Sequence, residues 1–194
     1  MRVFFVHPGP LTYAQIFLRL EPIGLELVAA AVRQAGHAVR LLDLQVETPR
    51  AYFRTVERWR PDVVAFGCNY LANVPEIVDL AKETKARFPH VFICVGGHSA
   101  SFTAAAMVEH SGGAIDCVLK GEGEATMPLL LLAIENGDAI TKVPGTTHFV
   151  PMERPYVVRD ALKMLYEAMI EGHQLIDYVG AVRRTIDDSV GIMD

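Results

Sequence analysis

Short apolar runs alternate with amphipathic segments along the first 136 residues of the chain. The runs are rich in β-branched residues and do not alternate strictly between apolar and polar, which is typical of strands that are covered on both faces. We predict strands at residues 3–6, 39–42, 63–66, 91–95 and 115–119.

The segments between these runs carry apolar residues at the i, i+3, i+4, i+7 spacing of helices that bury one face. One helix is predicted to begin after Pro22, which suits a first helical turn, and to end before Gly36. Another is predicted to begin at Asn73, a suitable N-cap residue before Pro75. A further helix is predicted to end before Gly137.

Strands that alternate with helices form βαβ units, and right-handed crossovers place the helices on both faces of a parallel sheet. We therefore expect an α/β fold, a Rossmann-like or flavodoxin-like doubly wound sheet of five parallel strands with a C-terminal helical extension. The α/β domain is expected at residues 1–145 and a linker at 146–160, with one short strand at 147–150. Two helices that form a hairpin are expected at 161–194.

Composition narrows the class of protein. The formal net charge of −5 favours neither nucleic acid nor an anionic membrane as a partner. No apolar run reaches the length of a transmembrane segment. The first strand runs directly into Pro8, unlike a signal peptide, so we expect a cytoplasmic protein.

The chain has three cysteines, Cys68, Cys94 and Cys117, each in or beside an apolar run. An odd number at wide spacing argues against a disulfide framework. No CxxC pair and no three-cysteine cluster is present, which disfavours a structural zinc site or an iron–sulfur cluster. We expect all three to be small buried hydrophobic residues.

Glycine-containing turns follow four of the five predicted strands, at residues 6–10, 66–71, 95–99 and 120–124. Ligands of parallel α/β sheets bind outside the carboxyl ends of the strands, and glycine allows a ligand or backbone to approach closely. The first connection, at residues 7–21, is long enough to be functional. It contains neither the dinucleotide-binding GxGxxG motif nor a P-loop, which disfavours nucleotide cofactors.

Several motifs of the chain together resemble those of a known family. In chain order they are Pro22-x-Gly24-Leu25, Leu27-x-Ala29-Ala30, Gly36-His37-x-Val39, Asp43, Pro61-Asp62-x-Val64, Gly96-Gly97-His98 and Gly121-Glu122-Gly123-Glu124. Over about residues 1–145 the chain resembles the N-terminal cobalamin (B12)-binding domain of B12-dependent radical-SAM enzymes. The stretches 18–22, 69–76 and 97–102 most resemble those of the hopanoid C-3 methylases.

The resemblance implies a domain that holds cobalamin, as methylcobalamin or hydroxocobalamin, and carries a methyl group on cobalt for a radical-SAM C-methyltransferase. The family's CxxxCxxC cluster motif is absent from this chain. S-adenosylmethionine and the [4Fe-4S] cluster are therefore expected in a radical-SAM barrel, either a partner subunit or a missing domain. We expect the chain to be non-catalytic alone, whether it is an excised domain or a standalone relative.

The resemblance also bears on the lower ligand of cobalt. Other cobalamin domains carry a DxHxxG motif whose His binds the metal from below. Aligning Gly24 with its last Gly puts Arg19 at the Asp and Glu21 at the His. This implies a base-off cobalamin without a lower histidine, with His7 as a minor alternative ligand and no other metal ligand.

The residues that the resemblance places at the cofactor are Glu21, Gly24, Cys68, Asn69, Tyr70, Leu71, Gly96, Gly97, His98, Ser99, Gly121, Glu122 and Gly123. Gly96 and Gly97 would let the nucleotide tail pass close to the backbone. Tyr70 would offer a flat face to the corrin or its tail, and Ser99 and Glu122 would hydrogen-bond its amide side chains.

Several of these residues also have a purely structural interpretation. Gly96 and Gly97 suit a tight turn, and Glu122 suits the first turn of a helix, where acidic residues are favoured. Glu21 is equally typical of a solvated helix start, and Tyr70 of a core residue.

Two other classes of function remain open. One is a regulatory or sensory B12 module, with the C-terminal helices as an output or homodimer surface. The other is a flavodoxin-like domain that binds FMN or no cofactor, without a corrinoid. A phosphorelay receiver is disfavoured, because His7 and Cys68 stand where it needs acidic residues, although Lys120 fits its lysine.

Overall fold

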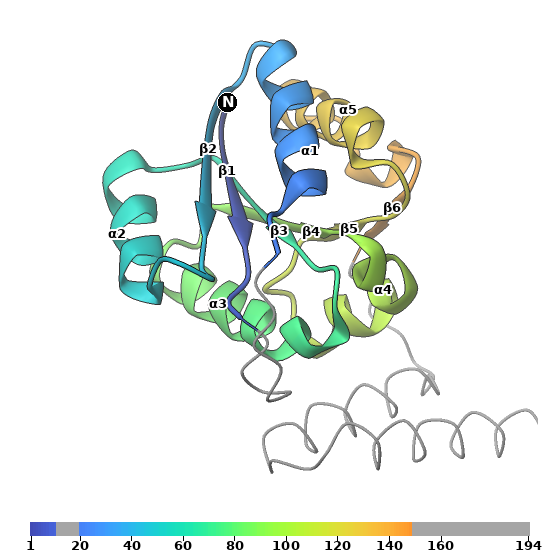
Figure 1. Cartoon of the computed structure of the whole chain (residues 1–194). Coiled ribbons are helices and arrows are strands. Elements are labelled where there is room, and N and C mark those ends of the chain that lie inside the picture. Colours follow the sequence, from blue (N-terminus) through green and yellow to red (C-terminus); the bar gives the residue numbers. More distant parts are fainter. Residues whose placement is uncertain (11–19, 149–194) are drawn as a thin grey trace, which may run out of the picture.

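A six-stranded sheet lies between two layers of helices in the computed structural model of the chain, which describes residues 1–10 and 20–148 (Figure 1). The strands are β1 Arg2–His7, β2 Ala38–Asp43, β3 Val63–Gly67, β4 Phe92–Gly96, β5 Cys117–Leu119 and β6 Thr146–His148. The helices are α1 Ile23–Gln34, α2 Pro49–Trp59, α3 Val74–Arg87, α4 His98–His110 and α5 Gly123–Asn136, with 3-10 turns η2 Leu71–Asn73 and η3 Ile140–Lys142.

The strand order is β2-β1-β3-β4-β5-β6. The first five strands are parallel, which confirms the doubly wound, flavodoxin-like sheet. The sixth strand, Thr146–His148, pairs antiparallel with β5 close to the short strand expected at 147–150. The sheet thus reaches three residues into the segment 146–160, and the rest of that segment and the hairpin at 161–194 lie outside the described residues.

Helices α2, α3 and α4 cover one face of the sheet, and α1 and α5 cover the other (Figure 1). The larger core, on the α2–α4 side, contains the stacked rings of Phe4 and Tyr52, whose centroids lie 5.7 Å apart. The buried hydroxyl groups of Tyr52 and Thr84 are 2.7 Å apart and satisfy each other. The smaller core, against α1 and α5, contains Phe5, Ala65, Cys94 and Met127.

Helix ends follow the expected local rules with one difference. Gly36 and Gly137 adopt positive φ angles of 92° and 70° just after α1 and α5. Asn73 does precede α3, but its side chain makes no capping hydrogen bond. The buried Asn73 amide instead donates to the carbonyl oxygen of Gly9 at 3.2 Å.

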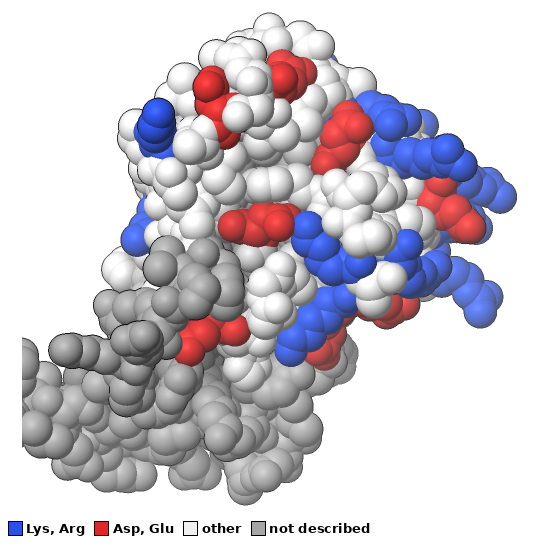
Figure 2. Space-filling view, turned by 180° about the vertical axis from the view of Figure 1, so that it is seen from behind, with Lys and Arg blue, Asp and Glu red and all other residues white. Residues whose placement is uncertain are grey.

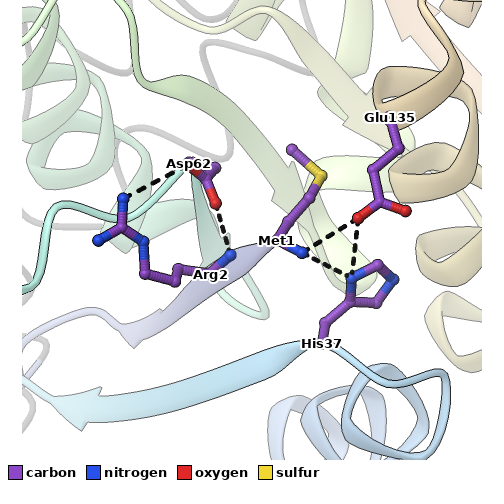
Figure 3. A network of polar contacts seen from close by, with 5 residues as sticks. All are labelled: Met1, Arg2, His37, Asp62 and Glu135. Carbon is purple, nitrogen blue, oxygen red and sulfur yellow. Dashed lines mark hydrogen bonds and ion pairs between the residues drawn. The ribbon is translucent and has the colours of Figure 1, made fainter.

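Polar contacts join the amino-terminal edge of the sheet to its neighbours (Figure 3). The amino group of Met1 lies 3.0 Å from Glu135 Oε1 on α5 and 3.2 Å from His37 Nδ1. Asp62 accepts the main-chain N–H of Arg2 at 2.6 Å. These groups lie at the opposite end of the strands from the glycine turns. They therefore stabilise the sheet without contacting the carboxyl ends of the strands, where the glycine turns lie.

Arg50, Arg54 and Arg58 are exposed and lie four residues apart along α2. Figure 2 shows Lys and Arg gathered on one side of the molecule, with Asp and Glu between them. Among the described residues, no helix combines the length and the apolar character that crossing a membrane requires.

Candidate functional site

The face of the sheet that packs against α1 and α5 carries side chains that shrink toward the carboxyl ends of the strands. The two series are Val63, Ala65 and Gly67 on β3 and Phe92, Cys94 and Gly96 on β4. The strand register aligns Ala65 with Cys94 and Gly67 with Gly96, so the small residues lie side by side. Because alternate residues share one face of a strand, this pattern hollows one face of the sheet.

A cavity of about 210 Å³ occupies the hollow, between the sheet and the first turns of α1 and α5. Its floor consists of Phe5, Ala65, Cys94 and Met127. It opens at the carboxyl ends of β3, β4 and β5, the edge of the sheet at which doubly wound folds bind ligands. The volume corresponds to roughly seven water molecules and lies below the roughly 300 Å³ minimum of drug-sized sites, so it suits one ring system.

Many of the site residues named from the sequence line this cavity: Gly24, Asn69, Gly96, Gly97, Gly121, Glu122 and Gly123. Cys68, Tyr70, Leu71, His98 and Ser99 lie on the same turns but outside the lining. Glu21 lines a separate depression of about 300 Å³ beside β2, together with Glu26 and Asp43. The structure therefore brings the glycine turns together and leaves Glu21 outside the cavity.

Gly97 joins the turns that follow β3 and β4. Its φ angle is +111°, and a Cβ atom there would lie only 2.7 Å from the carbonyl oxygen of Cys68. That oxygen accepts the N–H groups of Ser99 and Ala100 at 3.1 and 3.3 Å, and so caps α4. The Ser99 hydroxyl donates to the main-chain oxygen of Asn69 at 2.9 Å. The close approach that glycine permits here is between two stretches of backbone at the cavity mouth.

Two other glycines determine how the helices pack around the cavity. A Cβ atom on Gly123, at the start of α5, would lie 2.8 Å from a methyl carbon of Val28 on α1. A Cβ atom on Gly67 would lie 3.4 Å from a methyl carbon of Leu25. These glycines thus have a structural role, because they let α1 pack closely against β3 and α5. The same close packing forms the wall of the cavity, so a structural role and a place at the ligand site are compatible.

Exposed apolar side chains lie beside the mouth on the α4 side. Tyr70 and Leu71 are 38% and 42% exposed, and Phe102 on α4 is 74% exposed. The rings of Phe102 and His98 meet edge to face, with centroids 5.1 Å apart. Sequence reasoning missed Phe102, and it also missed the floor residues. The series of shrinking side chains on β3 and β4 was a signal for Ala65 and Cys94, but these residues meet only through the register of the two strands.

The connection between β1 and α1 is held at both ends by polar side chains, of which Asn73 and Gln45 are buried and Glu76 is half-buried. The N–H of Gly9 donates to Glu76 Oε2 at 2.8 Å, and the Gly9 carbonyl accepts the Asn73 amide. At the other end, the Gln45 side chain accepts the N–H of Leu20 at 3.0 Å and donates to its carbonyl at 2.8 Å. Gly9 and Leu20 are therefore both fixed to the rest of the fold by side-chain hydrogen bonds.

Replacing Glu76 tests the first of these anchors. Burial raises the pKa of Glu76 above its usual value, against the lowering effects of its hydrogen bonds with Gly9 and Asn73. A raised folded-state pKa means that this contribution to stability is complete below about pH 4.5 and is lost as pH rises through the folded pKa. We expect Glu76→Gln to remove this pH dependence, and Glu76→Ala to lower the free energy of unfolding by about 1–3 kcal/mol, because the Gly9 N–H loses its partner.

Urea unfolding of both variants between pH 4 and 8 measures these effects. Equal stability of the Gln and Ala variants would show that the Gly9 N–H does not depend on this side chain.

His7 lies at the end of β1, on the face that contains the cavity, but outside its lining. Only 8% of the residue is exposed, and Nδ1 has no hydrogen-bond partner among the described residues. Burial lowers the pKa of His7, and the nearby Asp43 carboxylate offsets this only in part. The imidazole is therefore held mainly neutral.

The three cysteines are free and buried, as expected. Burial raises the pKa of the Cys68 and Cys117 thiols to about 12, and that of Cys94 well above its usual value. Thiols with such pKa values are poor nucleophiles at neutral pH. Within residues 1–10 and 20–148, no three His, Cys, Asp or Glu side chains form a group that could hold a metal ion.

Comparisons with known proteins agree with the geometry. Residues 11–131 match the model of a family described as the B12 binding domain. The chain is 57% identical over 145 residues to the hopanoid C-3 methylase of Methylococcus capsulatus, which covers 75% of this chain and 28% of that protein. The chain thus spans little more than a quarter of this relative.

Solved structures support the fold. The cobalamin-dependent S-adenosylmethionine radical enzyme OxsB, with aqua-cobalamin and S-adenosylmethionine bound, matches 79% of this chain and 22% of its own, with a TM-score of 0.62 and 20% identity. The radical S-adenosylmethionine methyltransferase TsrM from Kitasatospora setae, with cobalamin and a [4Fe-4S] cluster bound, matches 77% and 27%, with a TM-score of 0.60 and 22% identity.

Proposed function

Because this chain belongs to the B12-binding domain family, we propose that it holds cobalamin at the carboxyl edge of its sheet, with the nucleotide tail in the cavity between α1 and α5. The observation that best supports this proposal is the cavity on the face of the sheet that packs against α1 and α5. The cavity is too small for a corrin ring but suits the single ring system of a nucleotide base. The corrin would then lie over the turns at the mouth, where Asn69, Gly97 and Glu122 are grouped.

The residues around the cavity fit this cofactor. The floor is apolar, and the main chain is open at Gly24 and Gly121, where a Cβ atom would meet nothing within 4 Å. The lining contains Glu122 and Glu124 but neither Lys nor Arg. The neutral amide side chains of a corrin match such a mouth, because carboxylates accept amide N–H groups.

The proposed role is that of a methyl-carrier domain in a radical-SAM C-methyltransferase of the hopanoid C-3 methylase type. When bound, cobalamin supplies a cobalt centre that accepts a methyl group derived from S-adenosylmethionine and donates it to a carbon acceptor. The chain itself positions the corrin and shields its tail. The high identity to a hopanoid C-3 methylase supports this role, and the remaining three quarters of that relative has room for the radical-SAM barrel.

We further propose that the chain holds cobalamin base-off and provides no histidine below cobalt. Glu21, which the resemblance places at the position of the usual histidine, is exposed. It lies beside β2 rather than in the cavity. Residues 1–145 would form the cobalamin domain, followed by a linker at 146–160 and a helical hairpin at 161–194, where a homodimer contact would lie.

An anaerobic titration with hydroxocobalamin tests this function. After desalting, we expect one corrinoid per chain and a base-off UV–visible spectrum, because the base is withdrawn into the cavity. A Glu21→His variant is expected to shift the spectrum toward histidine ligation. Glu26→His, a second exposed carboxylate beside the same depression, serves as the matched control and should leave the spectrum unchanged.

Loss of all corrinoid on desalting would overturn the proposed function and favour a flavodoxin-like domain without a corrinoid. A base-on spectrum would contradict both the base-off state and the placement of the nucleotide tail in the cavity. Identical spectra from the two histidine variants would contradict only the placement of Glu21 below cobalt.

A further inference from the structure

The floor of the cavity is chemically unusual for a site that receives a heterocyclic base. Its side chains offer the ring of Phe5, the methyl group of Ala65, the thiol of Cys94 and the thioether of Met127. No side-chain nitrogen or oxygen is present among these four residues. Bases that carry several polar atoms normally require such partners when they are buried.

The polar groups near the floor already have partners. The Cys94 thiol lies 3.9 Å from Met127 Sδ and donates to it, and Cys94 is 1% exposed. The main chains of Ala65 and Cys94 belong to the β3–β4 ladder of the sheet. Among the lining residues, side chains with nitrogen or oxygen atoms occur only at the mouth, on Asn69, Glu122 and Glu124.

The floor therefore distinguishes between bases by their polarity. An adenine placed there would bury ring nitrogens and an exocyclic amine without partners, and each unsatisfied group lowers affinity. A dimethylbenzimidazole would place its benzene ring and methyl groups against the two sulfur atoms, and sulfur–aromatic contacts are favourable. One edge of the dimethylbenzimidazole would still lie near the polar side chains of the mouth, Asn69, Glu122 and Glu124.

We propose that this cavity makes the chain selective for corrinoids with a benzimidazole lower base over those with a purine base. The proposal rests on the proposed function, since it requires that the tail enter the cavity. Cys94 and Met127 are the residues that determine this specificity, with Ala65 providing the space.

Binding of three corrinoids to the chain tests the selectivity. These are cobalamin, its adenine-containing analogue pseudocobalamin, and dicyanocobinamide, which has no base. We expect pseudocobalamin to bind at least about tenfold more weakly than cobalamin, which corresponds to about 1.4 kcal/mol, and cobinamide also to bind more weakly than cobalamin. Equal dissociation constants for cobalamin and pseudocobalamin would overturn the selectivity, even though both bind.

The cobinamide result separates failure of this inference from failure of the proposed function. If all three corrinoids bind equally well, the chain is a corrinoid protein whose cavity does not receive the base. If none binds, the proposed function fails and the selectivity fails with it.

A single-atom change at the floor tests the named residue. Cys94→Ser replaces the sulfur by a hydroxyl oxygen that can hydrogen-bond a purine nitrogen, and we expect the preference for cobalamin to fall at least about threefold. Cys117→Ser is the matched control. Cys117 is the neighbour of Cys94 in the β4–β5 register and equally buried, but it is outside the lining.

Equal preferences in the two serine variants and the unaltered chain would contradict a role for Cys94. Thermal unfolding reports whether each variant folds. If Cys94→Ser does not fold, Ala65→Ser places a hydroxyl on the same floor, and an unchanged preference there would count against the proposal in the same way.

Discussion

Replacing Ala65 by leucine is expected to abolish retention of cobalamin while the chain stays folded. Ala65 lies in the centre of β3, 6% exposed, with its methyl group at the cavity floor. A leucine side chain would extend into the space of about 210 Å³ that the base requires. Overpacking a filled core costs about 1–3 kcal/mol, but this substitution enters an existing cavity, so we expect little loss of stability.

The measurement is corrinoid retained after desalting, together with the thermal unfolding midpoint of the apo chain. We expect affinity for cobalamin to fall at least about a hundredfold, equivalent to about 2.7 kcal/mol. Ala65→Gly, which enlarges the cavity, is the control and should retain the corrinoid. Full retention by a folded Ala65→Leu variant would show that the tail does not enter this cavity.

The second large effect is expected at Gly97. Gly97→Ala should lower the free energy of unfolding by about 2–4 kcal/mol, because alanine disfavours its positive φ and the new Cβ meets the carbonyl of Cys68 at 2.7 Å. Gly96→Ala, one residue earlier, should cost less than about 1 kcal/mol. Its Cβ would meet nothing closer than Leu119 at 3.9 Å, and its φ is not positive.

Urea unfolding of the two alanine variants in the absence of cobalamin measures this difference. Because no ligand is present, the result reports the turn and not the cofactor. Similar stability of the two variants would show that the β3 and β4 turns can separate without cost, contrary to the contacts between Gly97, Cys68 and Ser99.

The sheet and its helices could be predicted from the sequence because their causes are local. Apolar runs of strand length and helical repeats between them indicate parallel βαβ units regardless of distant residues. Gly36 and Gly137 end their helices as expected, since positive φ is a property of the residue itself. The glycine turns were grouped at one edge because parallel strands present their carboxyl ends together.

The identity of the cavity floor could not be predicted in the same way. Ala65, Cys94 and Met127 are ordinary core residues when considered singly, and they form a cavity only because register places small side chains side by side beneath α5. The position of Glu21 also depends on tertiary structure. Motif alignment puts it at the ligand position, and the fold places it beside β2, outside the cavity, with the preceding residue Leu20 held by Gln45.

The sequence by itself determined the order of strands and helices, the edge of the sheet that carries the ligand turns, and the resemblance to the cobalamin-binding family. These depend on periodicity, glycine conformation and motif order, which are encoded over short stretches of chain. Only the tertiary structure decided which side chains meet in the hollow between α1, α5 and the sheet. Shape and polarity there arise from residues far apart in the chain, brought together by strand register and by helix packing around Gly67 and Gly123.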